Sequence, residues 1–129
     1  MEDSSKFVVL SVGQCGADEP RIGALLKKLG VGRIDQAHSN GEALQLCERH
    51  HYDLILINRI LDATGESGHT LVVKVLHSRP KQAVMLVSNY AEAQREAVAL
   101  GALHGFGKNE LSSPSTVTLL QKALAGERE

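Results

Sequence analysis

Short apolar runs alternate along the chain with segments in which apolar residues recur every three or four positions. The runs predict strands and the recurrences predict helices. The run at Asp53–Asn58 holds four consecutive apolar residues without polar alternation, which is typical of a strand covered on both faces in a parallel sheet. The other strands are predicted at Phe7–Val12, Arg33–Ala37, Ala83–Val87 and His104–Gly107.

A predicted helix follows each of these strands. The first begins at Asp18, which we expect to be its N-cap, and ends before Gly30. The later helices are predicted after Ser39–Gly41 up to His50 and at Thr70–Leu76, Ala91–Leu100 and Pro114–Ala125. Five strand–helix units in a row predict one α/β domain over residues 1–129, with a parallel sheet between two layers of helices.

Charge and composition narrow the classes of partner. Fourteen Lys and Arg residues oppose fifteen Asp and Glu residues, and the aromatic residues are two Tyr and two Phe with no Trp. Without a basic excess or stacking surfaces, no nucleic-acid partner is expected. The apolar runs are far shorter than the ~20 residues that span a bilayer, and the acidic start is unlike a secretory signal. We therefore expect a cytoplasmic protein with no membrane partner.

The residue types that hold metals are present but badly spaced. Cys15 and Cys47 are expected to be free thiols, because a reducing cytosol disfavours a disulfide. None of the six histidines has an i, i+4 partner or a neighbouring cysteine pair. We expect no metal and no cofactor.

The residues that follow the strands are the candidates for function, because open parallel sheets work at the carboxyl ends of their strands. These residues are Gly13–Gly16, Asn58, Ser88–Tyr90 and Lys108–Asn109. Together with the strand pattern they resemble the receiver domain of bacterial response regulators, over Phe7–Leu124. The resemblance implies a flavodoxin-like (βα)5 fold, three layers with strand order 2-1-3-4-5, and a two-component signalling module that is not an enzyme.

Three strand ends carry this resemblance. Tyr52–Asn58 is similar to the family's third strand, which ends in the aspartate that accepts a phosphoryl group from a histidine kinase. Val84–Tyr90 is similar to the fourth, with Ser88 at the position of the Ser or Thr that senses the phosphate. Lys108 stands at the position of the family's lysine after the fifth strand.

The acidic residues of that family are missing from this chain. Asn58 replaces the phosphoaccepting aspartate, and Gly13 and Gln14 fall on the acidic pair that holds Mg²⁺. Phosphoryl transfer to a carboxylate needs an anionic nucleophile and a cation that neutralises the phosphoryl oxygens. We therefore interpret the chain as a degenerate receiver that acts by phosphorylation-independent protein contact. Two alternatives stay open: a conventional receiver that uses Asp18 and Glu19 as a displaced acidic pair, and a ligand binder.

That ligand binder would be flavodoxin-like and receive an anion at the Gly13–Gly16 loop, although this loop lacks the GxGxxG spacing. The retained residues also have simpler structural readings. Lys108 is expected to pair with the side-chain oxygen of Asn58 or to reach solvent, and Ser88 is expected to cap the following helix. Gly105 stands where the family carries an aromatic switch residue.

By the same resemblance, the partner is a protein: a histidine kinase, a scaffold, an effector or a second copy of the chain. Receivers meet such partners through the face made by the fourth helix, fifth strand and fifth helix. The residues expected to be exposed on that face are Tyr90, Gln94, Arg95, Phe106 and Lys122, whereas Ala97, Val98, Leu119, Leu120 and Leu124 are assigned to the core. The alternative for Phe106 is a place in the core, and for Tyr90 a half-packed loop position.

Overall fold

One parallel sheet organises the protein, which we describe from a computed structural model over residues 7–126. Its five strands lie in the order β2-β1-β3-β4-β5, and all the paired strands are parallel. This confirms the predicted flavodoxin-like sheet with strand order 2-1-3-4-5. The strands are β1 (Phe7–Val12), β2 (Val31–Ala37), β3 (Leu54–Asn58), β4 (Val84–Val87) and β5 (Leu103–Phe106).

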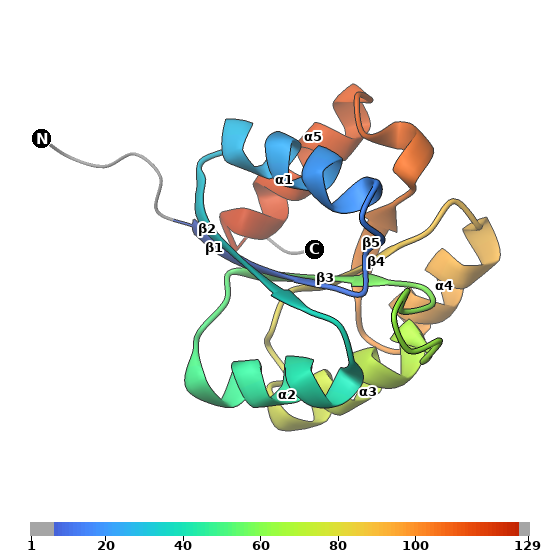
Figure 1. Cartoon of the computed structure of the whole chain (residues 1–129). Coiled ribbons are helices and arrows are strands. Elements are labelled where there is room, and N and C mark those ends of the chain that lie inside the picture. Colours follow the sequence, from blue (N-terminus) through green and yellow to red (C-terminus); the bar gives the residue numbers. More distant parts are fainter. Residues whose placement is uncertain (1–6, 127–129) are drawn as a thin grey trace, which may run out of the picture.

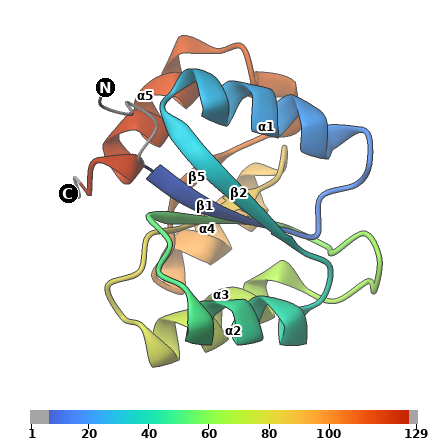
Figure 2. The same ribbon diagram turned by 60° about the vertical axis from the view of Figure 1, so that its left-hand side comes forward.

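Helices α1 and α5 cover one face of the sheet, and α2, α3 and α4 lie on the other (Figures 1 and 2). The predicted three layers are therefore confirmed. The helices are α1 (Asp18–Lys28), α2 (Asn40–Arg49), α3 (Gly68–Ser78), α4 (Ala91–Ala99) and α5 (Pro114–Leu124), with a short 3₁₀ helix η1 (Lys108–Glu110). Within residues 7–126, no helix has the length and apolar character needed to cross a bilayer.

The central strand β3 explains why its sequence shows no polar alternation. All five of its residues are buried. Ile55 and Ile57 pack in the cluster beneath α2, α3 and α4, whereas Leu54 and Leu56 pack in the cluster beneath α1 and α5. Burial on both faces favours an apolar residue at each position.

Strands β4 and β5 pair irregularly at their carboxyl ends. Met85 pairs with Leu103 and Val87 with Phe106, so one intervening residue of β4 faces two of β5. A β-carbon added to Gly105, inside this bulge, would lie 2.1 Å from the carbonyl oxygen of Leu86. Glycine is therefore required at position 105 by the close approach of the two backbones.

Three expectations about exposure on the α4–β5 side are wrong. Gln94 and Phe106 are 6% and 2% exposed, although both were expected on the surface, and Val98 is 45% exposed, although it was assigned to the core. For Gln94 and Val98 the cause is the rotation of α4, which turns Ala93, Gln94 and Ala97 toward the sheet. Phe106 is buried because it packs in the cluster beneath α1 and α5, which bears out the alternative of a core position. On hydrophobicity alone, Val98 was assigned to the interior in preference to Gln94. The hydrogen bonds that satisfy a buried amide cannot be seen in a periodic sequence pattern.

Candidate functional site

The loops that follow β1, β3, β4 and β5 meet at one edge of the sheet, on the right of Figure 1. Backbone hydrogen bonds join the first two loops, since the Asp62 N–H donates to the Gly13 carbonyl at 3.0 Å. The Ser88 N–H donates to the Phe106 carbonyl at 3.0 Å and joins the other two. The predicted site residues are thus gathered at this carboxyl edge, as expected for an open parallel sheet.

Asn58 ends β3 and acts as a cross-link inside the edge. Its side-chain amide nitrogen donates to the carbonyl oxygens of Gly13, at 3.0 Å, and Ile60, at 2.9 Å. The residue is 8% exposed. An ionised carboxylate has no N–H or O–H to donate, so an aspartate does not reproduce these bonds. The expected pairing of the Asn58 side-chain oxygen with Lys108 is wrong, because Lys108 pairs with Asp18.

Lys108 instead pairs with Asp18, the first residue of α1. Its Nζ lies 2.7 Å from Oδ2 of Asp18, and the thiol of Cys15 donates to the same oxygen at 3.1 Å. The hydrogen bond from Lys108, followed by that from Cys15, lowers the pKa of Asp18. Asp18 is not the N-cap of α1, because Ala17 occupies that position without a side-chain hydrogen bond. The carboxylate is thus bound across the edge of the sheet by Lys108, and on its own helix its other oxygen lies 3.5 Å from the guanidinium of Arg21.

Glu19 engages a different partner. The hydroxyl of Ser11 in β1 donates to Oε1 of Glu19 at 2.8 Å, and burial raises the pKa of this carboxyl group. The two acids of the displaced-pair alternative are therefore bound separately, Asp18 by Lys108 and Glu19 by Ser11. Among the described residues, no group of three or more His, Cys, Asp or Glu side chains is placed to hold a metal ion.

Gly13 has a backbone that excludes a side chain. Its φ is +75°, and an added β-carbon would lie 2.5 Å from Cγ and 2.8 Å from Cα of Leu61. The neighbouring Gln14 is 7% exposed, and its Oε1 has no hydrogen-bond partner in the described chain. Position 13, which the resemblance aligns with the first acidic-pair residue, thus has no charge and does not admit a carboxylate unless Leu61 moves.

Ser88 and its neighbours tie the β4 loop to the end of β5. The Ser88 hydroxyl oxygen accepts from the Tyr90 N–H at 3.1 Å, and Asn89 Oδ1 accepts from the Asn109 N–H at 3.1 Å. Tyr90 is itself the N-cap residue of α4, so the expectation that Ser88 caps this helix is wrong. The Ser88 hydroxyl instead stabilises the turn between β4 and α4, through its hydrogen bond from the Tyr90 N–H.

The long loop after β3 is anchored by Glu66, which the sequence pattern did not single out. Its carboxylate accepts from the Asn40 N–H at the start of α2 and from the Thr64 hydroxyl, both at 2.9 Å. The bond from Asn40 is the main cause that lowers the pKa of Glu66. A carboxylate at a helix N-terminus also interacts favourably with the helix dipole. This loop is therefore a fixed part of the edge.

The surface of α4, β5 and α5 carries most of the expected partner residues. Tyr90 is 62% exposed, with the Arg59 guanidinium 4.9 Å from its ring centre, and Arg95 and Lys122 are exposed. Two hollows of about 660 and 820 Å³ adjoin there. They share Val98, His104, Gly105, Phe106 and Glu110 as lining residues. Phe106, which was expected to project, forms part of the lining instead.

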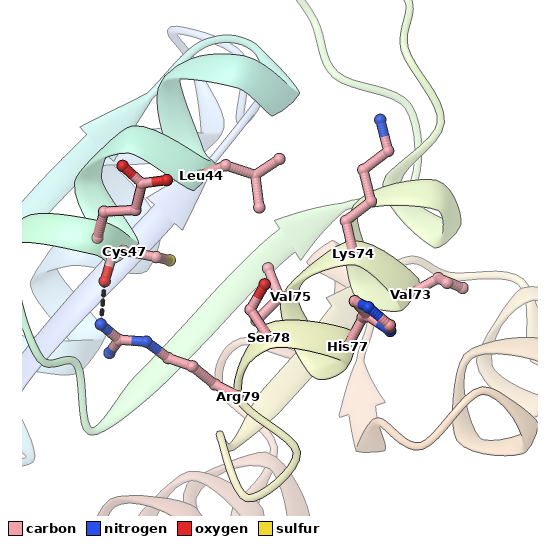
Figure 3. Close-up of a pocket in the computed structure, with 9 residues that line it drawn as sticks. Leu44, Cys47, Val73, Lys74, Val75, His77, Ser78 and Arg79 are labelled. Atoms are coloured by element: carbon pink, nitrogen blue, oxygen red, sulfur yellow. Dashed lines mark hydrogen bonds between the residues drawn. The ribbon is translucent and has the colours of Figure 1, made fainter.

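Apart from these two hollows, a groove of about 460 Å³ lies between α2 and α3 (Figure 3). Leu44 and Cys47 enter it from α2 and Val75 from α3, while the Arg79 guanidinium donates to the carbonyl oxygen of Cys47. Burial raises the pKa of the Cys47 thiol. Cys47 and the half-buried Cys15 are both free thiols, as expected.

Solved structures that are similar to this chain include receiver domains and response regulators. The signal receiver domain of an HD domain-containing protein from Pseudomonas fluorescens matches with a TM-score of 0.78 and 19% identity, over 97% of this chain and 91% of that one. NtrX from Brucella abortus matches with a TM-score of 0.75 and 16% identity, over 92% of this chain and 27% of its own.

A third match is a response regulator protein from Burkholderia pseudomallei with a phosphorylated aspartic acid, a calcium ion and citrate. Its TM-score is 0.70 at 21% identity, over 92% of this chain and 66% of that one. Comparisons with protein-family models and with curated proteins find no match. At these identities the similarity establishes the receiver fold, and this chain spans about a quarter of NtrX.

Proposed function

We propose that this chain is a receiver-type signalling module of a two-component system that works by protein contact and takes no phosphoryl group on an aspartate. One observation carries the proposal. At the end of β3, where the resembling family has its phosphoaccepting aspartate, the Asn58 amide donates to two carbonyl oxygens at 3.0 and 2.9 Å. The Asn58 side chain is neutral, and its two hydrogen bonds stabilise the carboxyl edge without any phosphoryl group.

The groups around Asn58 support the same proposal. A neutral amide is a poor nucleophile toward phosphorus, and position 13 has no side chain to offer a cation. The charge of Lys108, which would stabilise phosphoryl oxygens, is balanced by Asp18 at 2.7 Å. Electrostatic stabilisation of the transferring group is the largest contribution to such reactions, and these residues provide little of it.

We expect no gain in mass when the protein is incubated with acetyl phosphate and Mg²⁺, and no saturable NMR shifts at Gly13, Gln14 or Asn58 with Mg²⁺ or beryllofluoride. The missing anionic groups are the reason. Intact-protein mass spectrometry, with a conventional receiver as the positive control, makes the measurement. A stoichiometric adduct would overturn the proposal and would favour the displaced-pair alternative, in which Asp18 and Glu19 hold the cation.

For the contact itself we propose the surface of α4, β5 and α5. Tyr90 supplies exposed aromatic area, which often carries binding energy, and Arg95 and Lys122 supply positive charge on both sides of the adjoining hollows. The partner is a kinase, a scaffold, an effector or a second copy of the chain.

We expect the double variant Tyr90→Ala, Arg95→Glu to capture the partner at least about tenfold more weakly, because it removes an aromatic anchor and reverses a charge. Capture from a lysate of the source cells is quantified by mass spectrometry and repeated by titration with the purified partner. The matched control is Val73→Ala, Lys74→Glu on the exposed side of α3. Circular dichroism and melting must match the parent. If only the control loses capture, the contact lies beside the α2–α3 groove instead.

A further inference from the structure

Gln94 is a polar side chain buried on the sheet side of α4. It is 6% exposed and lies between the buried residues Ala93 and Ala97. Most buried amides have their hydrogen bonds made, because each unsatisfied group costs free energy. The partners of Gln94 therefore indicate what this residue does.

Those partners are backbone groups of two different strands. Nε2 donates to the carbonyl oxygen of Leu86 in β4 at 2.9 Å and to that of Ser88 at 3.2 Å. Oε1 accepts from the N–H of Gly105 in β5 at 3.0 Å. One side chain thus joins α4, the end of β4 and the end of β5.

The three groups lie at the bulge, where the β4–β5 ladder changes register. The Gln94 amide bonds groups of both strands there. Gly105 completes the arrangement, because a β-carbon at this position would lie 2.1 Å from the Leu86 oxygen and 3.1 Å from Oε1 of Gln94. The glycine and the glutamine are therefore mutually dependent: the first leaves the space that the second uses.

We propose that Gln94 locks α4, β4 and β5 in a single arrangement and so keeps the partner surface permanently formed. The inference rests on the proposed function, in which this surface acts without phosphorylation. Gly105 and Phe106 line both hollows of the surface, and Gln94 lines one of them, so the lock fixes the shape that a partner meets. A bistable switch needs two arrangements of α4 relative to β4 and β5. An arrangement that moved Gln94 away would leave the buried backbone groups of Leu86, Ser88 and Gly105 without this hydrogen-bond partner.

The test is amide hydrogen exchange by NMR on the whole chain, without any phosphoryl donor. Gln94→Met keeps the length and volume of the side chain but removes its donor and acceptor. We expect the Gly105 amide to exchange at least about tenfold faster in this variant, with the protection of β1 and β3 unchanged. The matched control is Gln45→Met at an exposed position of α2, which is expected to leave Gly105 as it is. Unchanged exchange of Gly105 in a folded Gln94→Met protein would overturn the proposal.

A second measurement applies even if that variant does not fold. Relaxation dispersion on the unmodified protein is expected to show no microsecond–millisecond exchange at Ser88, Gly105 and Phe106. Exchange at these amides would show two arrangements and would also overturn the lock. Neither result depends on phosphoryl uptake, so failure of the lock is distinguishable from failure of the proposed function, which the acetyl phosphate experiment decides.

Discussion

Asn58→Asp is expected to destabilise the protein by about 3 kcal/mol in the absence of divalent cations, and a divalent cation is expected to restore part of that stability. The new carboxylate would face the carbonyl oxygens of Gly13 and Ile60, which now lie 3.0 and 2.9 Å from an N–H donor. One carboxylate oxygen and these two carbonyl oxygens would then lie close together in a buried place, with no N–H or O–H donor among them. A hard cation such as Mg²⁺ or Ca²⁺ accepts this set of oxygen ligands.

Urea unfolding in EDTA and in millimolar Mg²⁺ or Ca²⁺ measures both parts of this prediction. Asn58→Ala is the matched control: it loses the same two hydrogen bonds but adds no charge, so its loss of stability is smaller and does not respond to the cation. Parent-like stability of Asn58→Asp in EDTA would contradict the structure of the edge. This variant is not expected to accept a phosphoryl group, because Lys108 stays paired with Asp18 and position 13 still lacks a carboxylate.

Gly13→Ala is expected to cost about 3 kcal/mol or more of unfolding free energy, for two independent reasons. The φ of +75° is strained for any residue with a β-carbon, and that carbon would lie 2.5 to 2.9 Å from three atoms of Leu61. One of these atoms is the backbone Cα, so a rotamer change does not relieve the contact. The same strain applies to Gly13→Asp, which is why an acidic pair is not easily rebuilt at this position.

Gly16→Ala, three residues further along the same loop, is the control for Gly13→Ala. Nothing lies within 4 Å of a β-carbon at Gly16, and its φ is not positive. We expect its unfolding free energy to stay within about 0.5 kcal/mol of the parent or to rise slightly, because alanine restricts the unfolded chain. Equal urea midpoints for the two variants would show that the β1 loop is not held against Leu61.

These two positions give the carboxyl edge a consistent physical character. The edge has an amide that donates to two carbonyl oxygens and a glycine packed against a leucine. Lys108 is neutralised by a carboxylate from α1. These groups of the edge are thus paired within the protein, which is consistent with the fixed contact module that we propose.

The sequence by itself determined the class of fold and the charge of the residues at the strand ends. Consecutive apolar residues predicted β3, and the alternation of five strands and five helices predicted the parallel sheet between two helical layers. The Thr70–Leu76 segment was predicted as a helix despite its valines, and it lies within α3. The absence of an acidic side chain at Gly13, Gln14 and Asn58 is equally local, because the charge of a residue is a property of its type.

Only the tertiary structure decided which polar groups meet. The Asp18–Lys108 pair joins residues far apart in the chain, and neither residue carries a local signal for the other. Gln94 lies on the buried side of α4 because backbone groups of β4 and β5 complete its hydrogen bonds, whereas Phe106 packs inward and Val98 is left exposed. Periodicity predicts which face of an element is apolar. The partner of a buried polar atom depends on geometry between elements, which exists only after the sheet and its helices have packed.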